Sequence, residues 1–416
     1  MKSLELKYGS KKLSLKMDEG RILSILSGKK FLPLKEPSES IKRVLKYPIS
    51  SKSFPEIFKA GEKVAIVVSD RTRNVAASVF LPVIINELNS IGVPDSDIFI
   101  VFACGTHRLH TKDEHAKIVG DDIAKRIKLI DHDCNDKDNL VLLGTTSRGT
   151  KVKVDKKVVD ADRVILTGAI TYHYFAGYGG GRKAVLPGIS AFETIQANHK
   201  LCLGSIDART GKLAGNPVHE DMLEAAKMLD PDFLFNVIVD DSGRVSSVFA
   251  GGLSAAHEAG CESLDDHCKI SCAKRSKFVI ASAGGGTKDL NFVQTHKAME
   301  NASYVLEEGG TMVLLGESSE GFPSGAYMKY VELGSSKAIE EELERNFTIP
   351  GHTILSAFKK AEKFRIIWVS RLAEATIRKI GITPAENLAH ALDLAGGIEE
   401  TYIMPAAYNT FPVAEG

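Results

Sequence analysis

Three short apolar runs decide the fold: VAIVVS at residues 64–69, IFIVFA at 98–103 and VILTGA at 164–169. Each run lacks charge and is rich in β-branched residues, which favours a strand over a helix of this length. Strands that are apolar on both faces are typical of parallel sheets covered by helices on both sides. These runs therefore predict an α/β protein built around a parallel sheet.

Strand-like runs alternate with helical patterns along most of the chain. We predict strands at Val64–Ser69, Ile98–Ala103, Ile127–Ile130, Leu140–Leu143, Arg163–Thr167, Leu234–Val239, Phe278–Ala281, Thr311–Leu315 and Phe364–Val369. We predict helices at Ser78–Ile91, Ala191–His199, Pro217–Leu229, Phe292–Leu306, Ser336–Arg345 and Ile354–Glu362. Such alternation implies α/β architecture with two Rossmann-like domains and mostly parallel sheets.

A polar segment at residues 257–277 precedes a fresh apolar strand and marks a domain boundary. We therefore predict an N-terminal domain of residues 1–270 and a C-terminal α/β domain of residues 271–400, both of ordinary domain size. Residues 401–416 form a tail that we expect to return to the N-terminal domain.

Composition excludes several classes of protein. The 416 residues include 53 Lys or Arg and 53 Asp or Glu, so the formal net charge is zero, which argues against nucleic-acid binding. No apolar run approaches the roughly 18–20 residues that span a bilayer, and the first residues lack the apolar stretch of a secretory signal. We expect a cytoplasmic protein. Six cysteines are too few for a disulfide framework and their spacing is poor for zinc, so we expect buried cysteines.

Polar or Gly-rich loops follow four of the predicted strands. Ligands bind beyond the carboxyl ends of strands in open α/β sheets, so these loops are the candidate site. They are Asp70–Arg73, Cys104–His110, Thr171–Lys183 and Gly284–Asn291, the last followed by Gln294 and Lys297. Their convergence on one edge of a parallel sheet would make an enzyme active site.

The segment Gly177–Lys183, GYGGGRK, is the most unusual of these loops. Closely spaced glycines let backbone N–H groups surround an anion such as a phosphate, and Arg182 and Lys183 add positive charge. Both the P-loop and the dinucleotide fingerprint fail, because each needs glycine where Arg182 stands. A plain Gly-rich turn with a solvated Arg–Lys pair remains the alternative. Lys183 would be a nucleophile if it is desolvated.

Two histidines, His107 and His173, follow different strands at the candidate site. Imidazoles on opposite sides of one substrate suit a reaction that needs a proton acceptor and a proton donor near neutral pH. Two unrelated loop histidines are the alternative. His199 ends a predicted helix. From this position alone we interpret it as a cap or core residue rather than a metal ligand.

Carboxylate recognition is indicated in two places. Gln294 and Lys297 are three residues apart on a predicted helix and share a face, although a solvated face is the alternative. Arg73 matches the geometry of a carboxylate or a phosphate, and Asp70 would accept a hydrogen bond from a ribose hydroxyl. These two residues also fit an ordinary helix N-terminus.

Over nearly its whole length the chain resembles the nickel-dependent lactate racemase family, the nickel-pincer-cofactor 2-hydroxyacid racemases and epimerases. The resemblance rests on short motifs in a specific order. They are Asp70-Arg71-Thr72-Arg73, Gly105-Thr106-His107-Arg108, Tyr172-His173, Gly179-Gly180-Gly181-Arg182-Lys183, Asn198-His199, Gly215-Asn216-Pro217, and Lys288-Asp289 leading to Gln294 and Lys297.

The resemblance implies two α/β domains with the active site in the interdomain cleft, and a cofactor that is a nickel-pincer nucleotide, a pyridinium mononucleotide holding nickel. It implies that Lys183 forms the covalent tether to the cofactor and that His199 binds the nickel. His107 and His173 would be the alternating general base and acid. The cofactor would also be held by Asp70, Arg71, Thr72, Arg73, Gly179, Gly180, Gly181 and Arg182. The substrate carboxylate would lie against Gln294 and Lys297, with Arg73 assisting.

The implied reaction inverts a 2-hydroxy acid by proton-coupled hydride transfer through a planar 2-keto acid. One departure bears on the substrate: lactate racemases carry a tyrosine before the substrate-binding glutamine, and here that position is Val293. The change frees volume and removes a hydrogen-bond donor, so we expect a substrate other than lactate.

Two other functions remain open from the residues alone. One is a phosphate-binding transferase or NTPase that uses the Gly177–Lys183 loop, and the other is a non-catalytic cofactor-binding protein. Paired histidines weigh against the second, since a binder has no need of two proton-transfer groups. The expected partner is a small-molecule substrate, with no nucleic acid and no membrane. A homodimer is left open.

Overall fold

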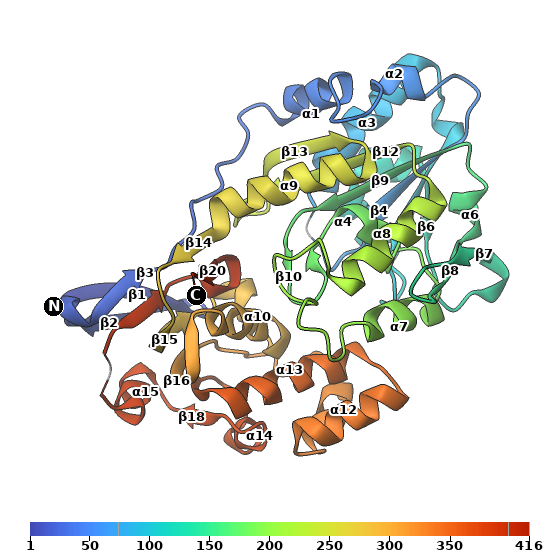
Figure 1. Ribbon diagram of the computed structural model, residues 1–416. Coiled ribbons are helices and arrows are strands. Elements are labelled where there is room, and N and C mark those ends of the chain that lie inside the picture. The colour runs from blue at the N-terminus through green and yellow to red at the C-terminus, as the bar shows by residue number, and fades with distance from the viewer. Residues whose placement is uncertain (74, 398, 416) are drawn as a thin grey trace. The chain divides into compact units, whose positions relative to one another are not determined.

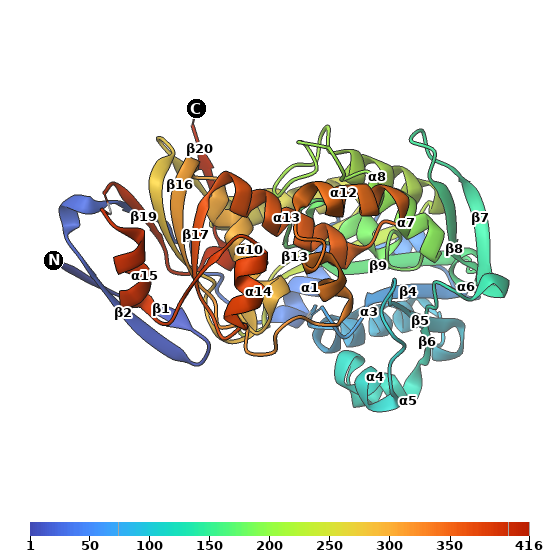
Figure 2. The same cartoon turned by 90° about the horizontal axis from the view of Figure 1, so that it is seen from below.

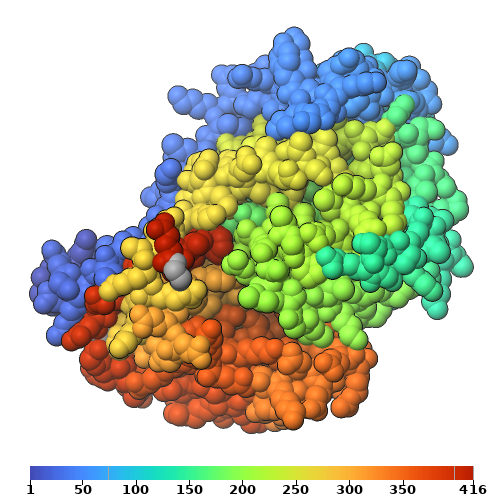
Figure 3. All heavy atoms as spheres, in the orientation of Figure 1, coloured from blue at the N-terminus to red at the C-terminus, as the bar shows by residue number. Residues whose placement is uncertain are grey.

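The computed structural model describes residues 1–73, 75–397 and 399–415, and the chain divides into two compact units. We call Lys30–Asp266 the central unit, and Met1–Lys29 together with His267–Gly416 the terminal unit. The predicted N-terminal domain differs from the central unit because residues 1–29 pack with the C-terminal part of the chain. Figure 3 shows these first residues, in blue, against the red C-terminal segment.

The central unit contains a six-stranded sheet in the order β13-β12-β9-β4-β5-β6 (Figure 1). Its strands are β4 Val64–Ser69, β5 Ile98–Ala103, β6 Lys128–Asp131, β9 Arg163–Ala169, β12 Phe233–Val239 and β13 Val245–Gly251. All neighbours are parallel except β12 and β13, which are antiparallel. Residues 64–68 are all fully buried, as expected of a strand that is covered on both faces.

Helices cover both faces of this sheet. They are α1 Pro37–Lys46, α2 Phe54–Ile57, α3 Ala77–Ile91, α4 Lys112–Val119, α5 Asp121–Arg126, α6 Lys156–Val159, α7 Phe192–Lys200, α8 Pro217–Leu229 and α9 Leu253–Cys268. Ile41 of α1 and Phe80 of α3 join the hydrophobic core on one face. Figure 2 shows α7 and α8 on the opposite side. Two small hairpins complete the unit: β7 Leu140–Thr145 with β8 Lys151–Asp155, and β10 Tyr172–His173 with β11 Gly177–Tyr178.

The terminal unit has its own six-stranded sheet, in the order β18-β17-β16-β15-β19-β3, and it is wholly parallel. Its strands are β3 Ile22–Ile25, β15 Ser276–Ser282, β16 Leu306–Leu315, β17 Arg365–Val369, β18 Thr383–Ala385 and β19 Thr401–Met404. Its helices are α10 Phe292–Ser303, α11 Ala326–Val331, α12 Ser336–Arg345, α13 Ile349–Lys363, α14 Glu374–Lys379 and α15 Leu388–Ala395.

Both ends of the chain take part in the terminal unit. The N-terminal hairpin, β1 Lys2–Tyr8 with β2 Lys11–Met17, buries Leu6 and Leu15 in one core with Leu388 of α15, and Figure 2 shows this hairpin beside α15. The predicted tail forms β20 Phe411–Ala414, which pairs with β14 Lys269–Cys272 within the same unit instead of returning to the N-terminal domain.

Two further observations concern the whole of the described chain. The six cysteines are buried, as predicted. Within the described residues, no helix combines the length and the apolar character needed to cross a membrane.

Candidate active site

The carboxyl ends of β4, β5 and β9 lie side by side, because the three strands are parallel neighbours in the central sheet. Each strand is followed by one of the loops that the sequence singled out. The backbone N–H of Gly105, after β5, donates a hydrogen bond to the carbonyl of Gly188 at 2.9 Å, which ties the His107 loop to the segment after Lys183. The structure thus gathers three of the four predicted loops at one edge.

Asp70 and His107 form a hydrogen-bonded pair at this edge. Asp70 is only 3% exposed, and its Oδ2 lies 2.7 Å from Nδ1 of His107. An ionised carboxylate can only accept, so Nδ1 carries the proton and Nε2 keeps a lone pair. Burial alone would raise the pKa of Asp70, but the hydrogen bond and charge of His107, the Thr72 hydroxyl and the charge of Arg73 together lower that pKa. In the neutral ring of His107, Nε2 is therefore the acceptor nitrogen.

The ring of Phe175 brings three predicted site residues together. It packs edge-on against His173, with ring centroids 4.5 Å apart, and at 67° against His199, with centroids 5.1 Å apart. The ammonium nitrogen of Lys183 lies 5.8 Å from the same ring centre. His173 comes from β10, Lys183 from the Gly-rich loop and His199 from α7, so one aromatic side chain organises residues from three elements.

His173 and Lys183 have defined protonation preferences. Nδ1 of His173 accepts the N–H of Ala176 at 3.2 Å, so in the neutral ring Nε2 carries the proton and is a donor. The pKa of Lys183 is lowered well below its ordinary value by burial, and also by the positive charges of Arg182 and Arg73. This environment favours the neutral amine, which is the nucleophilic form of lysine.

His199 is oriented by a chain of buried side chains. It is 2% exposed, and its Nδ1 lies 3.1 Å from the amide oxygen of Asn198. Asn198 in turn donates to the Asp221 carboxylate at 2.8 Å, which also accepts from the Thr146 and Thr150 hydroxyls. Because an amide oxygen can only accept, Nδ1 of His199 carries the proton, and Nε2 is the acceptor nitrogen of the neutral ring.

The Gly-rich loop approaches protein atoms closely. A Cβ on Gly180, at φ +73°, would lie 2.3 Å from the amide oxygen of Asn236, and one on Gly181 would lie 2.6 Å from the His257 ring. The amide oxygen of Asn236 accepts the N–H of Gly181 at 2.9 Å. These glycines are thus required for packing against β12 and α9, a reason that the sequence analysis did not give.

Arg182 also has an environment that differs from the predicted one. Its side chain is 1% exposed and donates to the carbonyl of Ala176 at 2.7 Å, and a second guanidinium nitrogen lies 2.9 Å from Nε2 of His257. Burial lowers the pKa of Arg182 to about 10. The guanidinium therefore stabilises the Gly-rich loop through these buried hydrogen bonds. Its contact with a cofactor phosphate stays a prediction.

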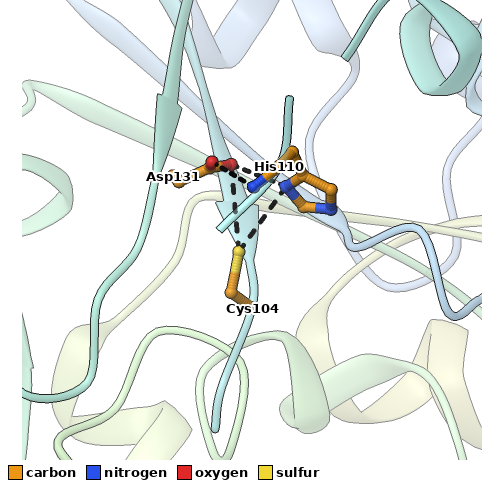
Figure 4. Close-up of side chains that lie close together, drawn as sticks. All are labelled: Cys104, His110 and Asp131. Carbon is orange, nitrogen blue, oxygen red and sulfur yellow. Dashed lines mark hydrogen bonds and ion pairs between the residues drawn. The ribbon is translucent and has the colours of Figure 1, made fainter. Parts of the chain in front are cut away.

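Sequence reasoning missed a cluster of Cys104, His110 and Asp131 (Figure 4), which contacts the Asp70–Arg73 loop through His110. Oδ1 of Asp131 lies 2.7 Å from Nδ1 of His110 and 2.9 Å from Nε2 of His115. Nε2 of His110 accepts the N–H of Arg71 at 3.1 Å. The signal available in the sequence was that His110 shares the loop of His107.

These three side chains also have the composition of a metal site, but their hydrogen bonds argue against one. Since Nε2 of His110 is an acceptor, Nδ1 must carry the proton of the neutral ring and cannot bind a cation there. Burial, with the charges of Asp131 and Asp70, raises the pKa of the Cys104 thiol far above its usual range, so the thiol is protonated when no cation is bound. The cluster instead fixes the backbone of Arg71 next to Asp70.

Gln294 and Lys297 lie in the terminal unit, on α10, which begins after Asn291 caps the N–H of Gln294. Nζ of Lys297 donates to the amide oxygen of Gln294 at 3.0 Å and to the hydroxyl of Tyr408 at 2.9 Å. The pair therefore shares a helix face as predicted. Tyr408 was missed because it lies in the segment that was taken for a tail.

Comparisons with known proteins identify the family of this chain. Residues 8–211 match the family model of the lactate racemase N-terminal domain, and residues 272–404 match that of the lactate racemase C-terminal domain. The lactate racemase of Thermoanaerobacterium thermosaccharolyticum is 32% identical over 410 residues, covering 96% of this chain and 95% of that protein. The lactate racemase of Lactiplantibacillus plantarum is 31% identical over 364 residues, covering 86% of this chain and 85% of its own.

Solved structures give the same result. The lactate racemase apoprotein of T. thermosaccharolyticum superposes with a TM-score of 0.91 at 28% identity, over 99% of this chain and all of that one. A Thermotoga maritima protein shares the fold, with a TM-score of 0.68 at 16% identity over 93% of this chain. The alternatives of a transferase or NTPase and of a non-catalytic binder find no support among these relatives. The chain belongs to the lactate racemase family and is an isomerase.

Proposed function

We propose that this protein racemises or epimerises a 2-hydroxy acid with a nickel-pincer nucleotide as its cofactor. The observation that carries the proposal is the gathering of His173, Lys183 and His199 around the single ring of Phe175. These are residues from three elements, and the family resemblance assigns each of them a part in cofactor binding or catalysis.

The residues present fit this cofactor. Lys183 would form the thioamide tether, for which a neutral amine is needed, and the burial that lowers the pKa of Lys183 favours that form. His199 would bind nickel through Nε2, because its Nδ1 is engaged with Asn198 and imidazole is a suitable nickel ligand. When bound, the group supplies an acceptor for the hydrogen on Cα together with its electron pair.

The chain itself handles the proton of the substrate hydroxyl. His107 begins the reaction as the acceptor, since Asp70 holds its proton on Nδ1 and leaves Nε2 open to the hydroxyl. Asp70 then stabilises the imidazolium that forms. The neutral His173 offers Nε2–H as a hydrogen-bond donor to the substrate oxygen, and it returns a proton to that oxygen only as the imidazolium, whose Nδ1 no longer accepts the N–H of Ala176. The two exchange roles for the opposite enantiomer, as the family resemblance implies.

Substrate binding would use α10. Lys297 supplies a positive charge for the carboxylate and Gln294 an amide donor, with Arg73 assisting from the Asp70 loop. Val293 has neither the bulk nor the hydroxyl of the tyrosine that lactate racemases carry there. We therefore propose a 2-hydroxy acid with a larger side chain than lactate.

Mass spectrometry with nickel analysis tests the cofactor assignment on protein produced together with the cofactor-synthesis enzymes. We expect a nickel-containing adduct that survives denaturation and disappears in Lys183→Ala. An adduct seen only under native conditions would refute the tether but keep the cofactor. No adduct and no nickel, while a lactate racemase produced in the same way carries both, would refute the proposal.

A panel of enantiopure 2-hydroxy acids tests the substrate assignment. The loaded protein should interconvert the enantiomers of aliphatic, aromatic or sugar acids faster than those of lactate. A clear preference for lactate would contradict the inference from Val293 and leave the racemase assignment intact.

A further inference from the structure

The hairpin that carries His173 is very short. Its strands, β10 Tyr172–His173 and β11 Gly177–Tyr178, have two residues each. Tyr172 lies opposite Tyr178 in the pairing of these strands. An isolated two-stranded hairpin is at best marginally stable in water, even when its strands are longer than these. A fixed position for His173 therefore requires contacts from other elements.

Asp265 of helix α9 contacts both strands of this hairpin. Its Oδ1 accepts a hydrogen bond from the hydroxyl of Tyr172 at 2.8 Å and another from the hydroxyl of Tyr178 at 2.7 Å. The two tyrosine rings lie against each other, with centroids 5.4 Å apart. Because one tyrosine comes from each strand, a single carboxylate oxygen connects the whole hairpin to α9.

The surroundings of Tyr178 favour its hydrogen bond to Asp265. Tyr178 is buried, so this bond is shielded from water. Burial, together with the hydrogen bond and the charge of Asp265, raises the pKa of Tyr178, and the hydroxyl therefore keeps the proton that it donates. A hydrogen bond to a charged acceptor is also stronger than one between neutral groups.

Helix α9 is a rigid support for Asp265. His257 and Cys261 of this helix are buried in the central unit. The helix also packs closely on the segment that leads into the hairpin, since a Cβ on Gly260 would lie 2.8 Å from Cγ1 of Ile170. The same helix therefore contacts the chain just before the hairpin and at both of its strands.

The orientation of the His173 ring depends on the turn that this hairpin closes. Its Nδ1 accepts the N–H of Ala176 at 3.2 Å, and its ring packs edge-on against Phe175. Both residues lie between the two strands, so a displacement of the hairpin would move the ring and these contacts together. Tyr178 also directly precedes the Gly-rich loop that ends at Lys183. The bonds from the two tyrosines thus fix the base of the turn.

We propose that Asp265 is a positioning residue of the racemase, which acts through Tyr172 and Tyr178 to keep Nε2 of His173 within hydrogen-bonding distance of the substrate oxygen. Asp265 takes no part in the proton transfer itself. A misplacement of about 1 Å can lower the rate of a reaction about 100-fold, so a hairpin without this contact should support a slower reaction. This inference rests on the proposed function, which gives His173 its role.

The test is a mutant cycle on protein loaded with cofactor. Asp265→Leu removes the acceptor at a similar side-chain size. The tyrosine pair, Tyr172→Phe with Tyr178→Phe, removes both donors and keeps the rings. A triple variant combines the three substitutions. Tyr402→Phe is the control, since it removes a hydroxyl that donates to the carbonyl of Lys274 at 2.9 Å in the terminal unit.

Two readouts separate the position of the hairpin from activity. The first is kcat and KM for the best substrate of the panel, compared at equal cofactor content as verified by mass spectrometry. The second is hydrogen–deuterium exchange of the N–H of Ala176, which donates to His173. Exchange is measured without substrate and reports how readily the turn opens, so it does not depend on turnover.

We expect Asp265→Leu to lower kcat about 10- to 100-fold with KM within about threefold of the parent, because the residues proposed to hold the substrate carboxylate are unchanged. The tyrosine pair should lower kcat to a similar extent in the parent, and by less than about threefold when residue 265 is already leucine. Both changes should accelerate exchange at Ala176 about tenfold or more. Tyr402→Phe should match the parent in all three measurements.

A kcat for Asp265→Leu within about threefold of the parent would overturn the inference while the racemase assignment stands. A lower kcat with unchanged exchange at Ala176 would also overturn it, since the hairpin would then be held without Asp265. Equal losses from the tyrosine pair in the two backgrounds would show that Asp265 does not act through these tyrosines, and would overturn it as well.

The tyrosine pair keeps the inference testable if Asp265→Leu does not fold. Parent-like kcat and exchange in that pair would then overturn the inference, and a loss of kcat with faster exchange would support it. A parent protein that racemises no acid of the panel would instead refute the proposed function. The two failures are distinguishable, because exchange at Ala176 measures the hold of Asp265 on the hairpin without any reaction.

Discussion

Asp70→Asn replaces one carboxylate oxygen with an NH2 group in the residue that orients His107, the proposed general base. Oδ2 of Asp70 faces Nδ1 of His107, while Oδ1 accepts both the N–H and the hydroxyl of Thr72, at 3.2 and 2.7 Å. Asparagine must turn its NH2 group toward one side. Toward Thr72, the NH2 meets a backbone N–H, so two donors face each other. Toward His107, the NH2 donates to Nδ1 and moves the ring proton to Nε2.

The second arrangement is the more stable. In the first arrangement the N–H of Thr72 loses its hydrogen bond, which costs about 0.5–1.5 kcal/mol, whereas the other orientation satisfies every group. In that orientation Nε2 of His107 carries the proton and can no longer accept one. A positioned general base contributes about 10²- to 10⁴-fold, and a comparable Asp→Asn change in a serine protease lowers kcat about 10⁴-fold. We expect kcat for Asp70→Asn to fall about 10²- to 10⁴-fold in both directions of the racemisation.

Circular dichroism of the enantiomers measures the rate on loaded protein, and mass spectrometry verifies equal cofactor content. Asp240→Asn is the matched control: Asp240 is also buried at the end of a strand of the same sheet and accepts the backbone N–H groups of Ser242 and Arg244 at 2.8 and 2.9 Å. It should keep the parent rate. A rate for Asp70→Asn within threefold of the parent at equal loading would refute the role given to the Asp70–His107 pair.

Three further outcomes are expected. His199→Ala should abolish nickel retention while Lys183 keeps the organic part of the adduct; retained nickel would assign the metal to other ligands. Lys183→Met should raise the free energy of unfolding of the apoprotein at pH 7, because the pKa of Lys183 is lowered in the folded state and not in the unfolded chain. This gain in stability should shrink as the pH rises toward about 10.4, the ordinary pKa of lysine. A gain in stability that does not depend on pH would contradict the lowered pKa of Lys183. Zn²⁺ should leave the Tm of the apoprotein unchanged, whereas His110→Ala should lower stability by about 1–3 kcal/mol, because it removes a buried side chain and its hydrogen bonds with the Arg71 N–H and Asp131; a saturable rise in Tm with Zn²⁺ would show a metal site at Cys104.

Local patterns predicted the central elements well. The run at residues 64–69 is the strand β4 within the same bounds, because a continuous apolar stretch between polar residues has no other stable environment than a covered sheet. Helix α8 begins at Pro217 and ends at Leu229 as predicted: Pro217 occupies the first turn, and the side chain of Asn216 accepts the N–H groups of Val218 and His219.

Pairing across long stretches of sequence could not be predicted. Strand β3, Ile22–Ile25, joins the terminal sheet next to β19, Thr401–Met404, and nothing in either segment specifies its partner. Likewise, nothing in the tail or in β14 specifies that these two segments pair. This is why the first residues were assigned to the wrong side of the predicted boundary.

Helix α9 was overlooked although its signal was present. The buried residues His257, Cys261, Leu264 and Cys268 are spaced by four, three and four, the period of a helix. Because the segment contains cysteines and histidines, it was read as a polar boundary with a weak metal pattern. The helical spacing of these residues predicts the structure correctly, because the thiols of Cys261 and Cys268 are buried.

For the site, the sequence pointed to residue types and the structure supplied their partners. Their positions after predicted strands singled out His107 and His173. These positions did not show that Asp70 holds the ring of His107, or that the N–H of Ala176 holds the ring of His173. Those contacts decide which nitrogen carries the proton, and they depend on loop geometry that no local pattern encodes.

The central claim is that the histidines move the hydroxyl proton while the Cα hydrogen travels with its electrons and returns to the same molecule. The most direct test is racemisation of an enantiopure acid deuterated at Cα, in ordinary water, with isotope content measured in both enantiomers by mass spectrometry. The account predicts that the inverted product keeps its deuterium. Loss of deuterium to solvent at the rate of inversion would show that a histidine removes the Cα hydrogen as a proton, and would contradict the account.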